Sequence, residues 1–209
     1  MGYFENVRYY RYCDVVAQSA FLNRDIILEA YSKGIFPWPD DEESLIPWCS
    51  PDPRAVLDFE NFHIPKSVKR EIKKSDFEFR FNTVFDEVIR NCASAGRKGQ
   101  NGTWIIQSMI DEYIALNREG YAVSFETWQD NWLVGGCYGI FINNVFSGES
   151  MFHKVSAASK FSLINLVSFM RDNYGLQWID VQQLTPLLAL FGAHEISRDD
   201  YLKRISVIR

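Results

Sequence analysis

Long apolar runs and paired cysteines are absent from this sequence of 209 residues. No segment approaches the roughly 18 consecutive apolar residues that a membrane helix requires, so we expect no membrane partner. The first residues lack the basic and apolar regions of a secretory leader, which favours a cytoplasmic location. The four cysteines, Cys13, Cys49, Cys92 and Cys137, form no CxxC pair, so the sequence predicts neither a zinc site nor a disulfide framework.

The signatures of cofactor and nucleophile chemistry are also missing. The three histidines, His63, His153 and His194, have neither the spacing of metal ligands nor a Ser-His-Asp order around them. A P-loop and a GxGxxG dinucleotide motif are absent. The Arg/Gln-x-x-Gly-x-Gly/Ala pattern that would hold the pyrophosphate of acyl-CoA is absent too. We therefore expect no metal and no cofactor.

Positive charge is in the minority, because 22 Lys and Arg stand against 27 Asp and Glu, for a formal net charge of −5. A general DNA-binding protein would usually be basic, so DNA is not an expected partner. One basic cluster remains on a short helix predicted over 65–74, where it forms either an ordinary solvated face or a contact surface for nucleic-acid phosphates. Its cations are Lys66, Lys69, Arg70, Lys73 and Lys74.

Aromatic residues are abundant, with 6 Trp, 10 Tyr and 16 Phe, which is ample material for a hydrophobic core. Apolar spacing predicts helices over 26–31, 65–74, 84–92, 103–116, 156–174 and 186–191. Alternation and composition predict strands over 54–62, 77–81, 121–128, 132–141, 145–152 and 178–182. Proline- and tryptophan-rich loops are expected over 34–40 and 47–54, and a flexible loop over 94–102.

Three of these strands follow one another in the middle of the chain and are separated by Asp130-Asn131 and Asn143-Asn144. Such pairs tolerate the positive φ that tight hairpins require, so we expect an antiparallel meander. Helices and strands alternate elsewhere. This order is typical of an α+β fold with a mainly antiparallel sheet.

Two short segments could carry chemistry. Asp180 and Gln182 lie on one face of the predicted strand 178–182, and Glu149 ends the strand 145–152. Both segments could equally present an ordinary solvated face. Trp38 and Trp104 lie beside loops, where they could stack on nucleobases or pack between subdomains.

Taken together, these segments resemble one bacterial family, the leucyl/phenylalanyl-tRNA–protein transferases. The resemblance runs from about residue 27 to 203, and its specificity comes from the joint order and spacing of five blocks. The blocks are 30–38, ending in Gly34-Ile35-Phe36-Pro37-Trp38; 48–57, with Ser50-Pro51-Asp52-Pro53-Arg54; Gly102-Thr103-Trp104-Ile105; 133–152, ending in Gly148-Glu149-Ser150-Met151-Phe152; and 179–193, beginning with Ile179-Asp180-Val181-Gln182.

The resemblance implies a small N-terminal unit over residues 1–53, with Pro/Trp-rich loops, followed by a GNAT-like aminoacyltransferase domain over 54–209. It also implies a reaction between leucyl-tRNA or phenylalanyl-tRNA and proteins that begin with Arg or Lys. The amino acid, Leu or Phe with Met as a third option, passes to the α-amino group and marks the protein for degradation. No cofactor is needed, and we expect a monomer.

The resemblance further assigns roles to residues. Asp180, Gln182 and Glu149 form the catalytic site, where the two carboxylates would supply negative charge for the cationic acceptor residue. Asp180 would orient Gln182, with its action as a general base or as a positioning group left open. Trp38 and Trp104 would lie near the terminal adenosine. The aminoacyl pocket would consist of Cys137, Phe146, Met151, Leu166, Met170 and Ile179.

Some positions depart from the family pattern. Ser19-Ala20-Phe21-Leu22 replaces an expected Gly-Gly-Asp-Leu segment, and Thr185 and Leu187 replace the usual Asn and His after Gln182. The second departure could change how the acceptor is held. Two alternatives therefore remain: an acyl-CoA-dependent N-acyltransferase, against which the missing pyrophosphate loop counts, and a non-catalytic module that binds the tRNA end or an N-terminal residue.

Overall fold

The computed structural model describes residues 2–10, 13–95 and 104–207. Three strands form a small sheet in the order β1-β3-β2, and seven form a large sheet in the order β10-β4-β9-β8-β7-β6-β5. The small sheet consists of β1 (Val15–Ser19), β2 (Phe36–Pro37) and β3 (Ile46–Cys49). The large sheet consists of β4 (Arg54–Asp58), β5 (Glu78–Phe81), β6 (Ala122–Gln129), β7 (Trp132–Ile142), β8 (Val145–His153), β9 (Trp178–Gln182) and β10 (His194–Ile196).

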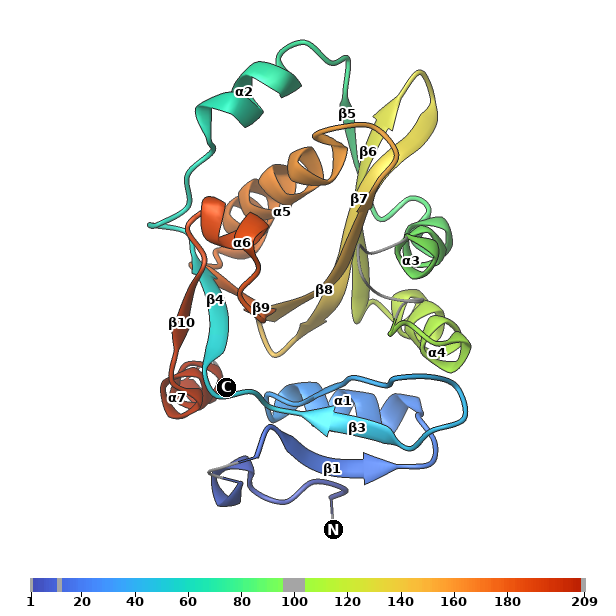
Figure 1. Cartoon of the computed structure of the whole chain (residues 1–209), viewed down its shortest axis with the longest axis vertical. Helices are drawn as coiled ribbons and strands as arrows, with labels where there is room; N and C mark the ends of the chain where they lie inside the picture. The colour runs from blue at the N-terminus through green and yellow to red at the C-terminus, as the bar shows by residue number, and fades with distance from the viewer. Residues whose placement is uncertain (1, 11–12, 96–103, 208–209) are drawn as a thin grey trace.

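The helices lie on both faces of the large sheet, with α3 and α4 on one side and α5 on the other (Figure 1). They are α1 (Arg24–Ser32), α2 (Lys66–Ile72), α3 (Phe85–Ser94), α4 (Gln107–Arg118), α5 (Ala158–Tyr174), α6 (Pro186–Leu190) and α7 (Arg198–Val207), with a 3-10 turn at Val7–Tyr9. Within the described part of the chain, no helix combines the length and the apolar character needed to cross a bilayer.

Strand pairing in the large sheet is antiparallel except between β8 and β9. Those two strands run parallel and pair at Ser147 and Asp180. Their parallel course brings Glu149, two residues after Ser147, close to Gln182, two residues after Asp180. The predicted α+β class with a mainly antiparallel sheet is confirmed.

The predicted meander is confirmed as β6, β7 and β8. Each of its two connections is a two-residue loop with positive φ at both residues: 51° and 62° at Asp130 and Asn131, and 51° and 60° at Asn143 and Asn144. This is the backbone conformation of the hairpin turn whose twist matches that of the strands, and Asn and Asp adopt it at small cost.

One hydrophobic cluster joins the N-terminal segment to the larger sheet. It includes Ile27 and Ala30 of α1, Tyr113 of α4, and Tyr138 and Ile140 of β7, all buried. A second cluster fills the space between α5 and the opposite face of the sheet. The first cluster therefore places α1 against the sheet that carries Glu149. The division of the chain at residues 53 and 54 stays a prediction.

Several predicted elements differ from the structure. The helix expected over 103–116 begins at Gln107, since Trp104, Ile105 and Ile106 are buried in a non-helical segment. The strand expected over 54–62 ends at Asp58 in a turn. The two proline-rich loops contain the short strands β2 and β3, and the flexible loop expected over 94–102 falls largely outside the described residues.

Candidate active site

A cavity of about 450 Å³ opens between β7, β8, β9 and α5, with α6 at its rim. Most of the residues selected from the sequence line it, although they come from distant parts of the chain. The selected residues in its wall are Trp38, Trp104, Cys137, Phe146, Glu149, Met151, Leu166, Ile179 and Gln182. Thr185 and Leu187, which depart from the family pattern, line it as well.

The apolar part of the wall contains five of the six residues expected to form the aminoacyl pocket. Cys137, Phe146, Leu166 and Ile179 are all at least 96% buried and belong to the cluster beneath α5. Met170 belongs to the same cluster but is fully buried and does not reach the cavity. Met170 therefore supports the pocket from behind.

The two selected tryptophans contact each other at the cavity. The Trp38 and Trp104 rings are stacked, with centroids 5.1 Å apart and an interplanar angle of 9°. Trp38 also makes an edge contact with Phe36, whose ring centroid is 5.8 Å away. The pair therefore forms one aromatic surface in the cavity wall, supplied by residues 66 positions apart in the sequence.

Asp180 lies behind the cavity wall and is completely buried. Its Oδ1 accepts hydrogen bonds from Arg54 Nε at 2.8 Å and from the Gln182 amide N–H at 2.9 Å. Its Oδ2 accepts from Arg54 Nη2 at 2.6 Å and from the Ser147 and Tyr201 hydroxyls, each at 3.0 Å. Both oxygens are thus engaged, and the bidentate ion pair with Arg54 matches the charge of Asp180.

Arg54 is held as tightly as its partner and is only 1% exposed. Its Nη1 donates to the Gly34 carbonyl at 3.2 Å, and its guanidinium carbon lies 4.7 Å and 4.5 Å from the ring centroids of Phe36 and Tyr201. Burial lowers the pKa of Arg54, but the charge of Asp180 and the neighbouring bonds more than offset this, so the net direction is upward. The guanidinium therefore stays charged.

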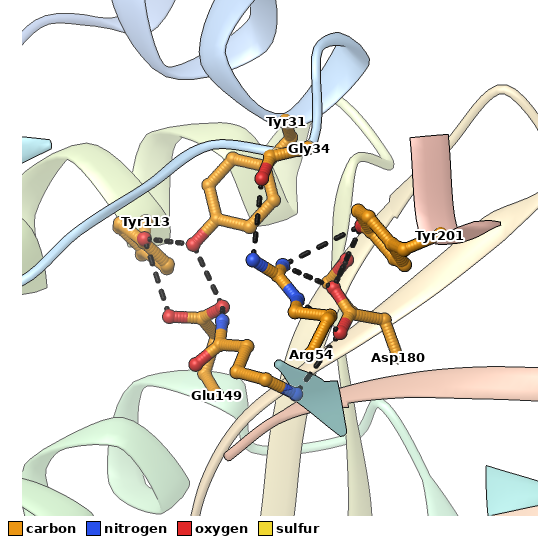
Figure 2. Close-up of polar contacts among 9 residues, drawn as sticks. Tyr31, Gly34, Arg54, Tyr113, Glu149, Asp180 and Tyr201 are labelled. Atoms are coloured by element: carbon orange, nitrogen blue, oxygen red, sulfur yellow. Dashed lines mark hydrogen bonds and ion pairs between the residues drawn. The ribbon is translucent and has the colours of Figure 1, made fainter. Parts of the chain in front are cut away.

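Glu149 differs from Asp180 in what surrounds it. Its Oε1 accepts from the Tyr31 hydroxyl and from Gln182 Nε2, both at 2.7 Å, and the Tyr113 hydroxyl lies 3.4 Å from its Oε2 (Figure 2). Burial raises the pKa of Glu149 to about 7; the Tyr31 bond works against this shift, and the charge of Asp180 adds to it. Glu149 therefore has polar partners but is close to its titration point at neutral pH.

The two carboxylates share one cation between them. Arg54 pairs with Asp180, and among the described residues Glu149 forms no ion pair. Also within those residues, no three His, Cys, Asp or Glu side chains are grouped so that they could hold a metal ion. The cavity wall thus contains one buried carboxylate whose charge is not compensated by a neighbouring cation.

Gln182 connects the two carboxylates. It lies at the end of β9 with a φ of 62°, a left-handed conformation that is strained for a residue other than glycine. Its amide N–H bonds to Asp180 and its side-chain amide nitrogen bonds to Glu149. Because Nε2 is used in this way, the amide oxygen of Gln182 is the atom left to accept a bond from a ligand in the cavity.

The basic residues selected on 65–74 lie outside the cavity. All five are exposed on or just after α2, and Val68 is the buried residue of that helix. Val68 packs with Leu163 and Phe191, in a cluster that also contacts Leu187 and Leu188 of α6. α2 therefore packs against both α5 and α6, and Figure 1 shows it on the side of α5 away from β9.

Four site residues were not selected from the sequence: Tyr31, Arg54, Tyr113 and Tyr201. Tyr31 and Arg54 lie in two of the blocks that carry the resemblance, and Tyr201 lies within its overall range, so a signal was present without an assigned role. For Tyr113 the sequence shows only a position on the apolar face of a predicted helix, which indicates a residue that packs in the core. Its hydroxyl role depends on Tyr31, 82 residues earlier.

Comparisons with known proteins find relatives over nearly the whole chain. A family model described as leucyl/phenylalanyl-tRNA protein transferase matches residues 56–206, and the model of its N-terminal domain matches 22–52. The leucyl/phenylalanyl-tRNA–protein transferase of Lawsonia intracellularis is 42% identical over 92% of this chain and 84% of its own length. That of Christiangramia forsetii is 44% identical over 90% of this chain and 89% of its own.

Solved structures match less closely. A structure titled L-PGS from Bacillus licheniformis aligns with a TM-score of 0.42 and 13% identity, over 79% of this chain and 52% of that one. The sequence relatives and the family models are decisive, because together they span nearly the whole chain. The chain belongs to the leucyl/phenylalanyl-tRNA–protein transferase family.

Proposed function

We propose that this protein transfers leucine or phenylalanine from aminoacyl-tRNA to the α-amino group of proteins whose first residue is Arg or Lys. The observation that carries this proposal is Glu149, a buried carboxylate in a largely apolar cavity and without an ion pair among the described residues. An apolar pocket suits leucine or phenylalanine, and an uncompensated carboxylate suits a cationic acceptor. The reaction would take place in the cytoplasm and mark the acceptor for degradation.

The donor end of the site combines the apolar pocket with the tryptophan pair. The aminoacyl side chain would enter between Cys137, Phe146 and Ile179. Since Trp38 and Trp104 already stack on each other, the terminal adenine would stack on an outer face of the pair.

The reaction exchanges an ester for an amide. The neutral α-amine of the acceptor attacks the ester carbonyl carbon, a C–N bond forms, and the C–O bond to the ribose of the terminal adenosine breaks. The ribose oxygen leaves with the proton that the amine gives up. Because the ester is already activated, the residues need mainly to orient the two substrates, which can supply about 7 kcal/mol or more of the barrier.

The acceptor end of the site assigns different roles to its three polar residues. Glu149 would pair with the cationic acceptor, and the amide oxygen of Gln182 would accept a hydrogen bond from the attacking amine. Asp180 would act as a positioning residue rather than as a general base, because both of its oxygens are engaged behind the wall. Its bond to the Gln182 N–H would hold that residue in its strained conformation.

The test measures transfer of labelled leucine and phenylalanine from charged tRNA to peptides that differ only in their first residue. Arg is compared with citrulline, which keeps its shape without its charge, and with Glu. We expect transfer to the Arg peptide at least roughly 10-fold faster than to citrulline, as for loss of a charged hydrogen bond. Preference for the Glu peptide would contradict the acceptor assignment. Binding of charged tRNA without any transfer would indicate a binding module.

Variants connect this preference to the site. Glu149→Gln should remove most of the discrimination between Arg and citrulline, while Asp180→Ala should lower transfer to both peptides alike. Glu60→Gln, at an exposed position away from the cavity, is the matched control and should behave as the unaltered protein. Unchanged discrimination in Glu149→Gln would show that the acceptor charge is recognised elsewhere.

The basic residues of α2 are the proposed contacts for the tRNA backbone. Lys69→Glu with Lys73→Glu should weaken tRNA binding and flatten the slope of log affinity against log salt by about 1.5 to 2, as for two lost phosphate contacts. Lys203→Glu, an exposed position on α7, is the control. An unchanged slope in the double variant would exclude α2 from the tRNA-binding surface.

A further inference from the structure

Two buried phenols meet at Glu149 without an assigned role. Tyr31 comes from α1 and Tyr113 from α4, and they are 8% and 0% exposed. Their hydroxyl oxygens are 2.7 Å apart, and the Tyr31 hydroxyl also lies 2.7 Å from Glu149 Oε1. A carboxylate on β8 is thus joined by hydrogen bonds to two helices, one of them from the N-terminal segment (Figure 2).

The number of available hydroxyl protons fixes which residue donates and which accepts in the hydrogen bonds among Tyr113, Tyr31 and Glu149. A phenol has one O–H to donate, and Tyr31 donates its own to Glu149 Oε1. The short contact between the two hydroxyls must then use the proton of Tyr113, whose other acceptor, Glu149 Oε2, is 3.4 Å away. The protons therefore run from Tyr113 to Tyr31 to Glu149, and each bond polarises the next.

The two oxygens of Glu149 differ in the hydrogen bonds that they accept. Oε1 accepts two short bonds, from Tyr31 and from Gln182 Nε2, both at 2.7 Å. Among the described residues, Oε2 has only the long contact with Tyr113, so its capacity to accept hydrogen bonds from that part of the chain is largely unused. Glu149 lines the cavity, and of its two oxygens Oε2 has the larger unused capacity for a bound cation.

We propose that Tyr31 and Tyr113 are positioning residues, which hold Glu149 in its charged form and keep Oε2 available for the acceptor. This inference rests on the proposed function, because it concerns how the carboxylate assigned to the acceptor is prepared. It also gives the N-terminal segment a direct part in transfer, since Tyr31 lies on α1.

The surroundings of Glu149 explain why donors are needed there. The titratable and charged groups that act on it are Tyr31 from α1, Tyr113 from α4, Asp180 from β9 and Arg54 from β4. Burial and Asp180 favour the neutral form, and Tyr31, Gln182 and Arg54 favour the charged form. Burial, together with the charge of Glu149, raises the pKa of both phenols well above 10, so they remain donors at neutral pH.

The test replaces each hydroxyl and keeps each ring. We expect Tyr31→Phe to raise the KM for the Arg peptide by roughly 10-fold, as for loss of a hydrogen bond to a charged group, with a smaller change in kcat. The acid limb of the pH profile should move up by about one unit, because a neighbouring donor no longer favours the charged carboxylate. Tyr113→Phe should produce the same changes at smaller size. Tyr174→Phe, an exposed phenol at the end of α5, is the control.

A double-mutant cycle separates positioning from packing. In a Glu149→Gln background, Tyr31→Phe should have little further effect, because the group that it prepares is already neutral. If Tyr31→Phe fails to fold, Tyr113→Phe carries the test, since it leaves the Tyr31 bond to Glu149 in place.

Two results would overturn the inference. The first is a Tyr31→Phe variant whose pH profile is unmoved and whose transfer falls equally for all acceptor peptides. The second is full additivity of the effects of Tyr31→Phe and Glu149→Gln in the double variant. Failure of the unaltered protein to transfer to the Arg peptide would instead overturn the proposed function itself. The two failures are therefore distinguishable in one series of measurements.

Discussion

Asp180 and Glu149 lie on neighbouring parallel strands and are both buried, yet they differ in how far the protein compensates their charges. Asp180 receives five hydrogen bonds and has Arg54 as its counter-ion. Glu149 receives two short hydrogen bonds and forms no ion pair among the described residues. The first group is complete without a substrate, whereas the second is not.

The difference shows how a fold can hold a reactive group in place. A buried charge with a counter-ion and full hydrogen bonding stabilises its neighbours once it has formed, while a buried charge without a counter-ion lowers stability. Asp180 therefore has the properties of a support, and Glu149 those of a group that a cationic ligand completes. A loss of stability at the second is consistent with selection for function rather than for stability.

A third buried carboxylate, Glu126, also forms no ion pair among the described residues, which shows that a missing cation does not by itself make a functional site. Glu126 on β6 accepts hydrogen bonds from the Thr83 and Val84 amides, the Thr83 and Ser124 hydroxyls and the Trp128 indole. These donors include two amides in the turn just before α3, so Glu126 fixes that turn to β6. It has a full set of donors and does not line the cavity, and both properties separate it from Glu149.

The largest effect is expected from removing the counter-ion of Asp180. Arg54→Ala should lower the free energy of unfolding by about 3–5 kcal/mol, because it leaves a buried carboxylate unpaired. Urea denaturation would measure this loss. Arg204→Ala, which removes a bidentate but partly exposed pair with Asp58, is the matched control and should lose about 1 kcal/mol or less. Equal losses in the two variants would remove the distinction between the buried and the exposed pair.

Removing the charge of Glu149 is expected to increase the free energy of unfolding rather than lower it. Its folded pKa of about 7 lies above the ordinary value of 4.5, so the folded state binds the proton more tightly and stability falls as pH rises between these values. Glu149→Gln should remove this loss, making the variant more stable above pH 7 by up to about 3 kcal/mol while it loses acceptor discrimination. The gain should vanish near pH 4.5. Unfolding measured at several pH values would check this, and a destabilised variant at pH 8 would contradict it.

The smallest effect is expected from trimming one donor of Asp180. Tyr201→Phe removes the 3.0 Å bond to Oδ2 but keeps the ring that stacks against Arg54. Since Asp180 keeps its other four hydrogen bonds, the free energy of unfolding should fall by only about 1 kcal/mol. Thermal unfolding of this variant beside Tyr31→Phe would compare one lost donor at each carboxylate. A loss as large as that of Arg54→Ala would mean that the ion pair alone does not hold Asp180.

Local patterns predicted most of the elements, because helices and hairpins depend on residues close in sequence. Asn23 caps α1 from a position close in sequence, and both Asn/Asp-containing turns adopt the expected conformation. The short strands β1 and β10 had no such pattern. Trp104 was placed on a helix because apolar spacing cannot distinguish a buried non-helical segment from the start of a helix.

The site was predictable only in part, for a related reason. The apolar pocket residues were found by resemblance, and all but Met170 reach the cavity. The role of Arg54 could not be found, since its partner lies 126 residues later and an arginine at a strand start is usually exposed. Tyr31 and Tyr113 had the spacing of core residues, and their hydroxyl contacts exist only in the assembled fold.

The position of β4 between β9 and β10 has a consequence for synthesis of the chain. Arg54 leaves the ribosome 126 residues before Asp180, which is roughly 6 to 25 s at about 5–20 residues per second. During that interval β4 has neither of its neighbouring strands, and its cation has no counter-ion. The network that orients Gln182 can therefore close only after β9 has emerged, so a prematurely terminated chain would display an unpaired β-strand edge but no competent transferase site.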